Sequence, residues 1–468
     1  MFELYHGLRP LVVVHIPVAT VAGFRVPSDR DKVHDMNVGT NAGIMNDCCG
    51  LMTMLVYTAQ RKDGMSPPIP ISTKQRTSEP YLVNVPVDDS EIPQFDLNIE
   101  NRVRTNLFSW NGQFSPQFIE ALIQRFVREG DTVLDPFVGS GTTVYECARA
   151  GIAVYGIELN PSAFFMAKLY ELCHADSQER ELLIRTVGSI VNTCLYEENV
   201  ISKILEFYSG MEESAIKSTV ALLVTLLDIY NNAVDSKLLF EKWDKLRSII
   251  RSLPFSNALI QVSLGDARYL SIPDNTIDAV LTSPPYINVF NYHQNYRRSI
   301  EALGYDILEI AKSELGANRK HRGNRFYTVI QYCIDMALAV RELSRVCKED
   351  TRLMLVVGRE SNVLGHSFYN SDLVYQICTE IFRLSFDIRQ ERVFKNKFGK
   401  LIYEDILHFR NRKDSLLVDE ELLCDGARDI AKRALLAKCE LANDDNIIEL
   451  LHKAVNNASQ ILPSEASI

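Results

Sequence analysis

Two short segments of this 468-residue sequence combine residue types that could do chemistry. The first, residues 134–143, has the sequence LDPFVGSGTT, in which a glycine- and serine-rich turn follows Asp135. Glycines allow positive φ and let the backbone approach a ligand closely, and the first amides of a following helix would face that ligand. A second acid, Glu158, follows roughly 20 residues later, about the spacing at which a carboxylate meets ribose hydroxyls in dinucleotide-binding folds.

The composition of this turn narrows the kind of ligand. The turn lacks G-x-x-x-x-G-K-[ST], which argues against a phosphate-binding loop. Val144 stands where the third glycine of G-x-G-x-x-G would fall. The segment therefore favours a nucleoside without pyrophosphate over a dinucleotide, with an ordinary tight turn as the structural alternative.

The second segment, residues 282–286, has the sequence TSPPY. Two prolines fix φ and remove two backbone N–H donors, so the carbonyls of Ser283 and Pro284 and the Ser283 hydroxyl can point outward as acceptors. Acceptors aimed at both N–H bonds of a planar amino group help to localise its conjugated lone pair on nitrogen. Tyr286 offers a face on which an extruded base can stack. A plain Pro-Pro turn after a strand is the alternative.

Both segments are expected to follow strands. Apolar residues at helical spacing predict a helix over residues 115–126, and the strand–helix–strand pattern of residues 132–157 predicts a βαβ unit, the start of an open, mostly parallel sheet. Residues 163–258 are almost continuously helical in pattern. Alternation then resumes, with strands expected at 276–281, 352–357, 386–394 and 402–409 and helices at 327–347 and 372–381.

Taken together, the two segments resemble the motifs of a known family. The loop followed by GIELNP at residues 156–161 is similar to the first two motifs of the DNA amino-methyltransferases, which modify cytosine N4 or adenine N6, and SPPY resembles their fourth motif. GDA at residues 265–267 matches the third, and residues 108–116 resemble the motif that precedes the loop. The resemblance implies S-adenosyl-L-methionine as methyl donor and an α/β fold, a Rossmann-like doubly wound, mostly parallel sheet (the methyltransferase fold) with a large helical insertion.

The resemblance also assigns roles to individual residues. Glu158 would hold the ribose, Asp266 would approach the adenine amino group, and aromatic residues near position 110 could contact the sulfonium by cation–π attraction. The residues implied to bind the cofactor are Trp110, Phe114, Ser115, Asp135, Phe137, Gly139, Gly141, Thr142, Glu158, Asp266 and Ala267. The residues implied in catalysis are Ser283, Pro284, Pro285 and Tyr286, and no metal is expected.

The expected activity is site-specific methylation of double-stranded DNA, with the target base flipped out of the helix. Serine at the first tetrapeptide position is commoner in the N4-cytosine branch, so cytosine N4 is favoured over adenine N6. An RNA guanine or adenine amino-methyltransferase and a non-catalytic DNA-binding subunit that retains the cofactor fold are the alternatives. A cognate restriction endonuclease would fit such an enzyme, and the oligomeric state is left open.

Composition adds weaker constraints. The net charge of −10 argues mildly against a pure nucleic-acid-binding module, so any DNA contact must come from local basic segments. In the first segment, residues 291–325, Tyr292, Tyr296 and Tyr305 lie among the basic residues and offer stacking beside phosphate contacts. The second segment, residues 389–400, includes Arg392. A solvated charged face is the alternative for both. The residues expected to contact DNA are Arg297, Arg298, Arg319, Lys320, Arg322, Lys395 and Lys397.

Cysteine usage and hydropathy indicate a cytoplasmic protein. None of the ten cysteines forms a C-x-x-C pair, which suggests reduced thiols. No apolar stretch approaches the roughly 20 residues of a membrane span. The expected organisation is an N-terminal extension and linker (1–100), the cofactor-loop part of the methyltransferase domain (101–162), a helical insertion (163–258), the catalytic part (259–412) and C-terminal helices (413–468).

Overall fold

The computed structural model of this chain describes residues 80–287, 292–316, 321, 323–396, 399–413 and 419–465. Most of the expected N-terminal extension, residues 1–79, therefore lies outside the described residues. The remainder of that segment contains a short 3-10 helix, η1 (Tyr81–Asn84), and a short helix, α1 (Gln94–Asn98).

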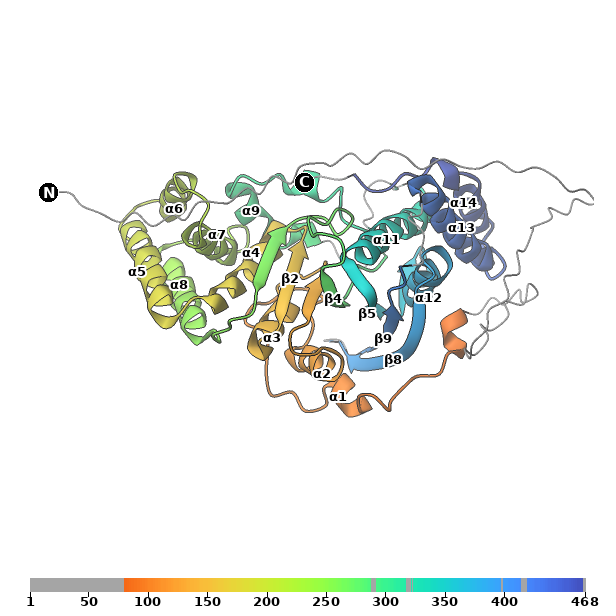
Figure 1. Cartoon of the computed structure of the whole chain (residues 1–468). Helices are drawn as coiled ribbons and strands as arrows, with labels where there is room; N and C mark the ends of the chain where they lie inside the picture. The colour runs from red at the N-terminus through yellow and green to blue at the C-terminus, as the bar shows by residue number, and fades with distance from the viewer. Residues whose placement is uncertain are drawn as a thin grey trace, which may run out of the picture. The chain divides into compact units, whose positions relative to one another are not determined.

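A seven-stranded sheet forms the centre of the described chain, in the order β3-β2-β1-β4-β5-β9-β8 (Figure 1). Strands β1 to β5 pair in parallel, whereas β9 is antiparallel to both β5 and β8. The fold is therefore the α/β, mostly parallel type that the sequence predicted. Its strands are β1 (Thr132–Asp135), β2 (Ala153–Glu158), β3 (Ile260–Leu264), β4 (Ile277–Thr282), β5 (Cys347–Gly358), β8 (Ser385–Lys395) and β9 (Leu401–Arg410).

β1 has β2 on one side and β4 on the other. The sheet therefore extends from β1 first in one direction and then in the other, which makes this position a topological switch point. In open α/β sheets, ligands bind outside the carboxyl ends of the strands at such a switch point. The two segments singled out in the sequence follow β1 and β4 directly. They are therefore neighbours at one edge of the sheet.

Helices cover both faces of the sheet, as its buried apolar strands require. Those that precede or follow the first strands are α2 (Pro116–Phe126), with Pro116 at its first position, and α3 (Thr142–Ala150). Beyond the cofactor loop lie α4 (Pro161–Lys168), α5 (Ser177–Cys194), α6 (Val200–Ser209), α7 (Ala215–Leu227) and α8 (Ser236–Ser252), of which α5 to α8 gather on the β3 side of the sheet (Figure 1). Later helices are α11 (Tyr327–Val346), α12 (Asn370–Gln376), α13 (Glu420–Cys439) and α14 (Asp445–Asn456).

Several elements were not foreseen. The first strand after the helical stretch was expected at residues 276–281, but β3 precedes it and pairs with β2. Two short helices, α9 (Arg297–Ala302) and α10 (Ile307–Ile310), follow the tetrapeptide. A two-stranded sheet, β6 (Glu360–Val363) and β7 (His366–Tyr369), follows β5. Strands of four or five residues give too short a pattern to stand out from a loop.

Both edges of the sheet are covered by polar contacts. At the β8 edge, Asp88 N donates to Arg389 O at 2.7 Å, and Val393 N donates to Asn98 Oδ1 at 2.8 Å. At the β3 edge, the backbone of Val262 bonds Glu171 Oε1 through its N–H at 2.7 Å and Lys168 Nζ through its carbonyl at 3.0 Å. These outward-facing backbone groups of both edge strands therefore have partners.

Within the ranges that the structure describes, no helix is long and apolar enough to cross a membrane. The same ranges contain no cluster of three or more His, Cys, Asp or Glu side chains arranged to hold a metal ion. The eight cysteines that are described are all free thiols.

Candidate active site

A cavity of about 800 Å³ opens at the carboxyl ends of β1, β2 and β4. It brings the glycine turn, the residues before it and the tetrapeptide to one shared space, although they are far apart in sequence. Of the predicted site residues, those that line it are Trp110, Phe114, Phe137, Gly139, Thr142, Glu158, Asp266, Ala267, Ser283, Pro284, Pro285 and Tyr286. Ser115, Asp135 and Gly141 do not line it.

The glycine turn is shaped by close packing at two positions. Gly139 has φ of 55°, and a Cβ there would lie 3.4 Å from Cδ1 of Trp110. Gly141 has φ of 89°, and a Cβ there would lie 2.7 Å from Cε2 of Tyr170. Gly139 therefore lets the backbone reach the cavity, whereas Gly141 lets the start of α3 pack on the helices behind it.

Asp135 lies beneath the cavity, only 1% exposed. Its Oδ1 accepts hydrogen bonds from Phe137 N at 3.1 Å and from Thr282 Oγ1 at 2.6 Å. Burial raises the pKa of Asp135 to about 6. The carboxylate thus joins the turn after β1 to the last residue of β4, which is a positioning role.

Glu158 joins the turn after β1 to the turn after β2 and lines the cavity. Its Oε2 accepts a hydrogen bond from Gly139 N at 2.8 Å, and its Oε1 accepts one from Asn160 N at 2.8 Å. Burial raises its pKa to about 7, with the negative charges of Asp135 and Glu314 adding to that effect. Each oxygen keeps a further lone pair, so two vicinal hydroxyls of a ribose could donate to this carboxylate.

The wall near the glycine turn is aromatic. Trp110 stacks on Tyr292 with ring centroids 6.0 Å apart and planes 12° apart. Gln113 Oε1 accepts hydrogen bonds from Trp110 N at 3.1 Å and from Ser140 Oγ at 3.0 Å, which ties this wall to the turn. Tyr292 was expected among the residues available to stack on DNA bases; it lies instead against Trp110 inside the cavity.

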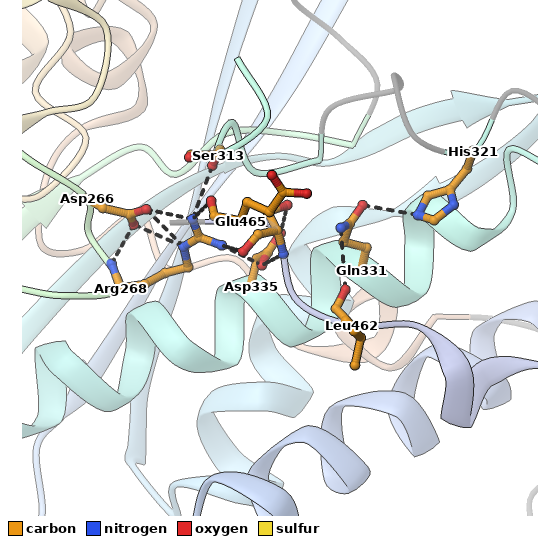
Figure 2. Close-up of polar contacts among 9 residues, drawn as sticks. Asp266, Arg268, Ser313, His321, Gln331, Asp335, Leu462 and Glu465 are labelled. Atoms are coloured by element: carbon orange, nitrogen blue, oxygen red, sulfur yellow. Dashed lines mark hydrogen bonds and ion pairs between the residues drawn. The ribbon is translucent and has the colours of Figure 1, made fainter. Parts of the chain in front are cut away.

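Asp266 lines the cavity, but its carboxylate is bound to Arg268, as Figure 2 shows. Its Oδ1 receives Arg268 N at 2.9 Å and Nε at 3.0 Å, and its Oδ2 receives Nη2 at 2.6 Å and Nε at 3.2 Å. Arg268 is itself fully buried and also donates to Asp335 Oδ1 at 2.9 Å. Its guanidinium further donates to the carbonyls of Ser464 at 2.9 Å and Glu465 at 3.0 Å, so the C-terminal segment is part of this network.

The tetrapeptide places its polar groups together. Ser283 Oγ lies 3.1 Å from the Tyr286 hydroxyl, which donates to Glu404 Oε1 at 3.4 Å. The Tyr286 ring lies against Gly358, where a Cβ would be 2.6 Å from Cε2 of the ring. Burial raises the pKa of Tyr286 well above its ordinary value, so the phenol stays neutral.

The far wall comes from the antiparallel strands, and sequence reasoning missed it. Glu404 on β9 pairs across the sheet with Arg392 on β8, with Arg392 Nη1 3.0 Å from Glu404 Oε2. Arg392 had been noted only as one member of a basic segment. Its guanidinium lies 4.6 Å from the ring centroids of Phe118 and Phe394, and it is 8% exposed. Nothing in the strand pattern distinguishes a buried cross-strand ion pair from two outward-facing charges.

The expected DNA-contacting residues are only partly described. Arg297 and Arg298 lie on α9, where both pair with Glu301, at 2.7 Å and 3.5 Å, and neither lines the cavity. Lys395 is exposed at the end of β8. The other four, Arg319, Lys320, Arg322 and Lys397, lie outside the described residues.

Comparison with known proteins shows which family the chain is similar to. Residues 59–169 match the model of a family described as DNA methylase, the N6/N4 type. The chain is 35% identical over 79 residues to the type II methyltransferase M.MjaII of Methanocaldococcus jannaschii, covering 16% of this chain and 15% of that protein. It is 24% identical over 298 residues to the type II methyltransferase M.BsoBI of Geobacillus stearothermophilus, covering 48% of this chain and 58% of that protein. The relationship to the N6/N4 DNA methylases that the motifs predicted is confirmed.

The chain matches only part of its relatives. It spans less than two thirds of the length of both relatives. Among solved structures, a SAM-dependent methyltransferase from Methanosarcina mazei is 12% identical, with a TM-score of 0.30, and the comparison covers 62% of this chain and 97% of that one. Enzymes of the N6/N4 family take their methyl group from S-adenosyl-L-methionine.

The residues present fit that cofactor. The cavity is large enough for a nucleoside with an amino-acid side arm. Glu158 offers acceptors for a ribose, and the stacked Trp110 and Tyr292 could face a sulfonium. Glu314, which also lines the cavity, has a buried Oε1 with no hydrogen-bond partner among the described residues.

Proposed function

We propose that this protein is an S-adenosyl-L-methionine-dependent DNA methyltransferase that modifies an exocyclic amino group, cytosine N4 in preference to adenine N6. The observation that carries the proposal is the single cavity shared by the glycine turn after β1 and the Ser283–Tyr286 tetrapeptide after β4. A methyl donor held at the first would lie beside a base held at the second. The family match supports DNA as the substrate class.

The chain's own residues orient and activate the target amino group. When bound, the cofactor supplies an electrophilic methyl group. The carbonyls of Ser283 and Pro284 and the Ser283 hydroxyl accept from the target amino group, which localises its lone pair on nitrogen. The contact between Ser283 Oγ and the Tyr286 hydroxyl, 3.1 Å, orients the serine. Gly358 leaves room for the Tyr286 ring.

Cytosine is favoured because the first tetrapeptide residue is Ser283, as in the N4-cytosine branch. Adenine N6 is the second candidate, since the same acceptors suit either amino group. An RNA amino-methyltransferase and a non-catalytic subunit are less well supported, because the matched family is a DNA methylase and the loop and tetrapeptide are intact. We further propose that the protein acts inside the cell and is accompanied there by a cognate restriction endonuclease.

The test is to express the chain, digest the host DNA to nucleosides and identify the modified one by mass spectrometry. N4-methylcytosine supports the proposal in full, and N6-methyladenine supports the class but not the base. Ser283→Ala should lose methyl transfer while still binding the cofactor. A wild-type protein that binds the cofactor but methylates neither DNA nor RNA would favour the non-catalytic reading.

A further inference from the structure

The cavity contains two acids that could meet the purine end of the cofactor, and only one has a free acceptor. A carboxylate offers about four lone-pair positions. Arg268 makes four donor contacts with the Asp266 carboxylate, at 2.6 to 3.2 Å (Figure 2). The acid at the position that the family uses for adenine is therefore already saturated.

The Glu314 carboxylate, in contrast, has one oxygen that accepts no hydrogen bond from the described residues. Its Oε2 is held 3.0 Å from His293 Nδ1, a ring that is itself 1% exposed, so the side chain is fixed from behind. Its Oε1 is buried and, within the part of the chain that the structure describes, has no hydrogen-bond partner. The residue is 9% exposed and lines the cavity together with Ala267. An unmatched buried acceptor of this kind costs free energy unless a ligand satisfies it.

The surroundings of Glu314 suit a planar purine. Leu159, Ala267, Ile310 and Leu315 line the same cavity with apolar atoms. Glu158, which we assign to the ribose, is close enough for the charge of Glu314 to raise its pKa further. An acceptor in the same cavity as Glu158 and among apolar side chains is suited to a donor at the edge of the purine ring.

We propose that Glu314, not Asp266, accepts the hydrogen bond from the exocyclic amino group of the cofactor's adenine, while Asp266 and Arg268 form a fixed wall behind it. This rests on the proposed function, because it assumes an adenosine cofactor in this cavity. The proposal gives the segment after the tetrapeptide a role in recognising the cofactor's adenine. None of the sequence motifs covers this segment.

The experiment compares two product-like ligands by calorimetry on the full chain. S-adenosylhomocysteine carries the amino donor, whereas S-inosylhomocysteine has a carbonyl acceptor at the same position. Wild-type protein should bind the adenosyl ligand roughly tenfold or more tightly than the inosyl ligand, since a carbonyl facing the carboxylate leaves both acceptors unmatched. Glu314→Ala should lose most of that preference by weakening the adenosyl ligand alone.

Controls separate this role from a structural one. Glu314→Gln keeps the size of the side chain and one acceptor, so it should retain part of the preference. Asp266→Asn disturbs the wall and should weaken both ligands alike. The exposed Glu309→Gln, in the preceding turn and outside the cavity, should change neither.

The outcomes are distinct. If Glu314→Ala keeps the wild-type preference, or if Asp266→Asn alone abolishes it, the inference is wrong while the proposed function stands. An equal loss for both ligands in Glu314→Ala would also contradict it, because that is the result of local collapse. Wild-type protein that binds neither ligand would overturn the proposed function as well.

Discussion

The Thr282 hydroxyl donates a hydrogen bond of 2.6 Å to Oδ1 of Asp135, across the boundary between β4 and β1. Both residues are buried, and each stands at the end of its strand, immediately before a segment that lines the cavity. The contact sets the spacing between the cofactor turn and the tetrapeptide. Loss of this hydrogen bond should therefore disturb both the cofactor turn and the tetrapeptide.

Thr282→Val tests this contact, because valine keeps the shape and removes the hydroxyl. We expect a loss of about 1–3 kcal/mol in the free energy of unfolding, since a buried carboxylate loses a donor. Chemical denaturation measures it, with Thr193→Val as the control because that hydroxyl is exposed and bonds only its own helix. Equal stability of Thr282→Val and wild type would show that Asp135 finds another donor.

Glu158 predicts a pH dependence of cofactor binding. Its pKa is raised to about 7, and ribose hydroxyls donate best to the ionised form. Binding therefore favours the deprotonated acid, so affinity for S-adenosylhomocysteine should rise with pH through about 7 and fall below it. Between pH 8 and pH 6 we expect a loss of about fivefold to tenfold by calorimetry.

The control for this titration is Glu158→Gln, which has no proton to lose. It should bind more weakly than wild type at pH 8 and show a flat profile over the same range. A Glu158→Gln profile that still falls below pH 7 would assign the titration to another group.

Gly358→Ala should disturb the tetrapeptide by contact alone. The new Cβ would lie 2.6 Å from Cε2 of Tyr286, a separation that forces the ring to move. We expect methyl transfer to fall at least tenfold, since misplaced reacting groups are costly, while cofactor affinity changes little. Gly210→Ala, where the nearest atoms are at ordinary van der Waals distance, serves as the control. Full activity of Gly358→Ala would mean that the Tyr286 ring position is not critical.

Ser464 links the C-terminal segment to the network behind Asp266. Its hydroxyl donates to Asp335 Oδ2 at 2.6 Å, and Asp335 is fully buried. Ser464→Ala should lower the free energy of unfolding by about 1–3 kcal/mol because the buried carboxylate loses that donor. Thermal denaturation measures this loss, with the exposed Ser459→Ala as the control. Equal melting temperatures for the two variants would show that the Ser464 hydroxyl does not stabilise the core.

Much of the fold could be predicted because its signals are local. The pattern of β1, α3 and β2 predicted the start of a mostly parallel sheet, and the composition of the two cavity segments predicted the turns that follow β1 and β4. Most of the cofactor and catalytic residues that the family resemblance implied line the cavity. Long, strongly periodic elements such as α11 were foreseen for the same reason.

What could not be predicted depends on contacts between distant residues. The fourfold engagement of Asp266 by Arg268 involves a residue two positions away, yet its fixed geometry depends on Asp335 and on carbonyls at 464 and 465. The ion pair between Arg392 and Glu404 requires the register of β8 and β9. Such pairings have no pattern in the sequence, because burial decides whether a charge faces a partner or water.

The covered edges of the sheet have a consequence for how variants would fail. The side chains of Asn98, Lys168 and Glu171 occupy backbone groups that would otherwise be open to a strand from another molecule. Substitutions there would leave the chemistry of the cavity intact in each molecule that folds. Their first effect would be aggregation during expression, so a low yield from such a variant should not be taken for a loss of catalytic competence.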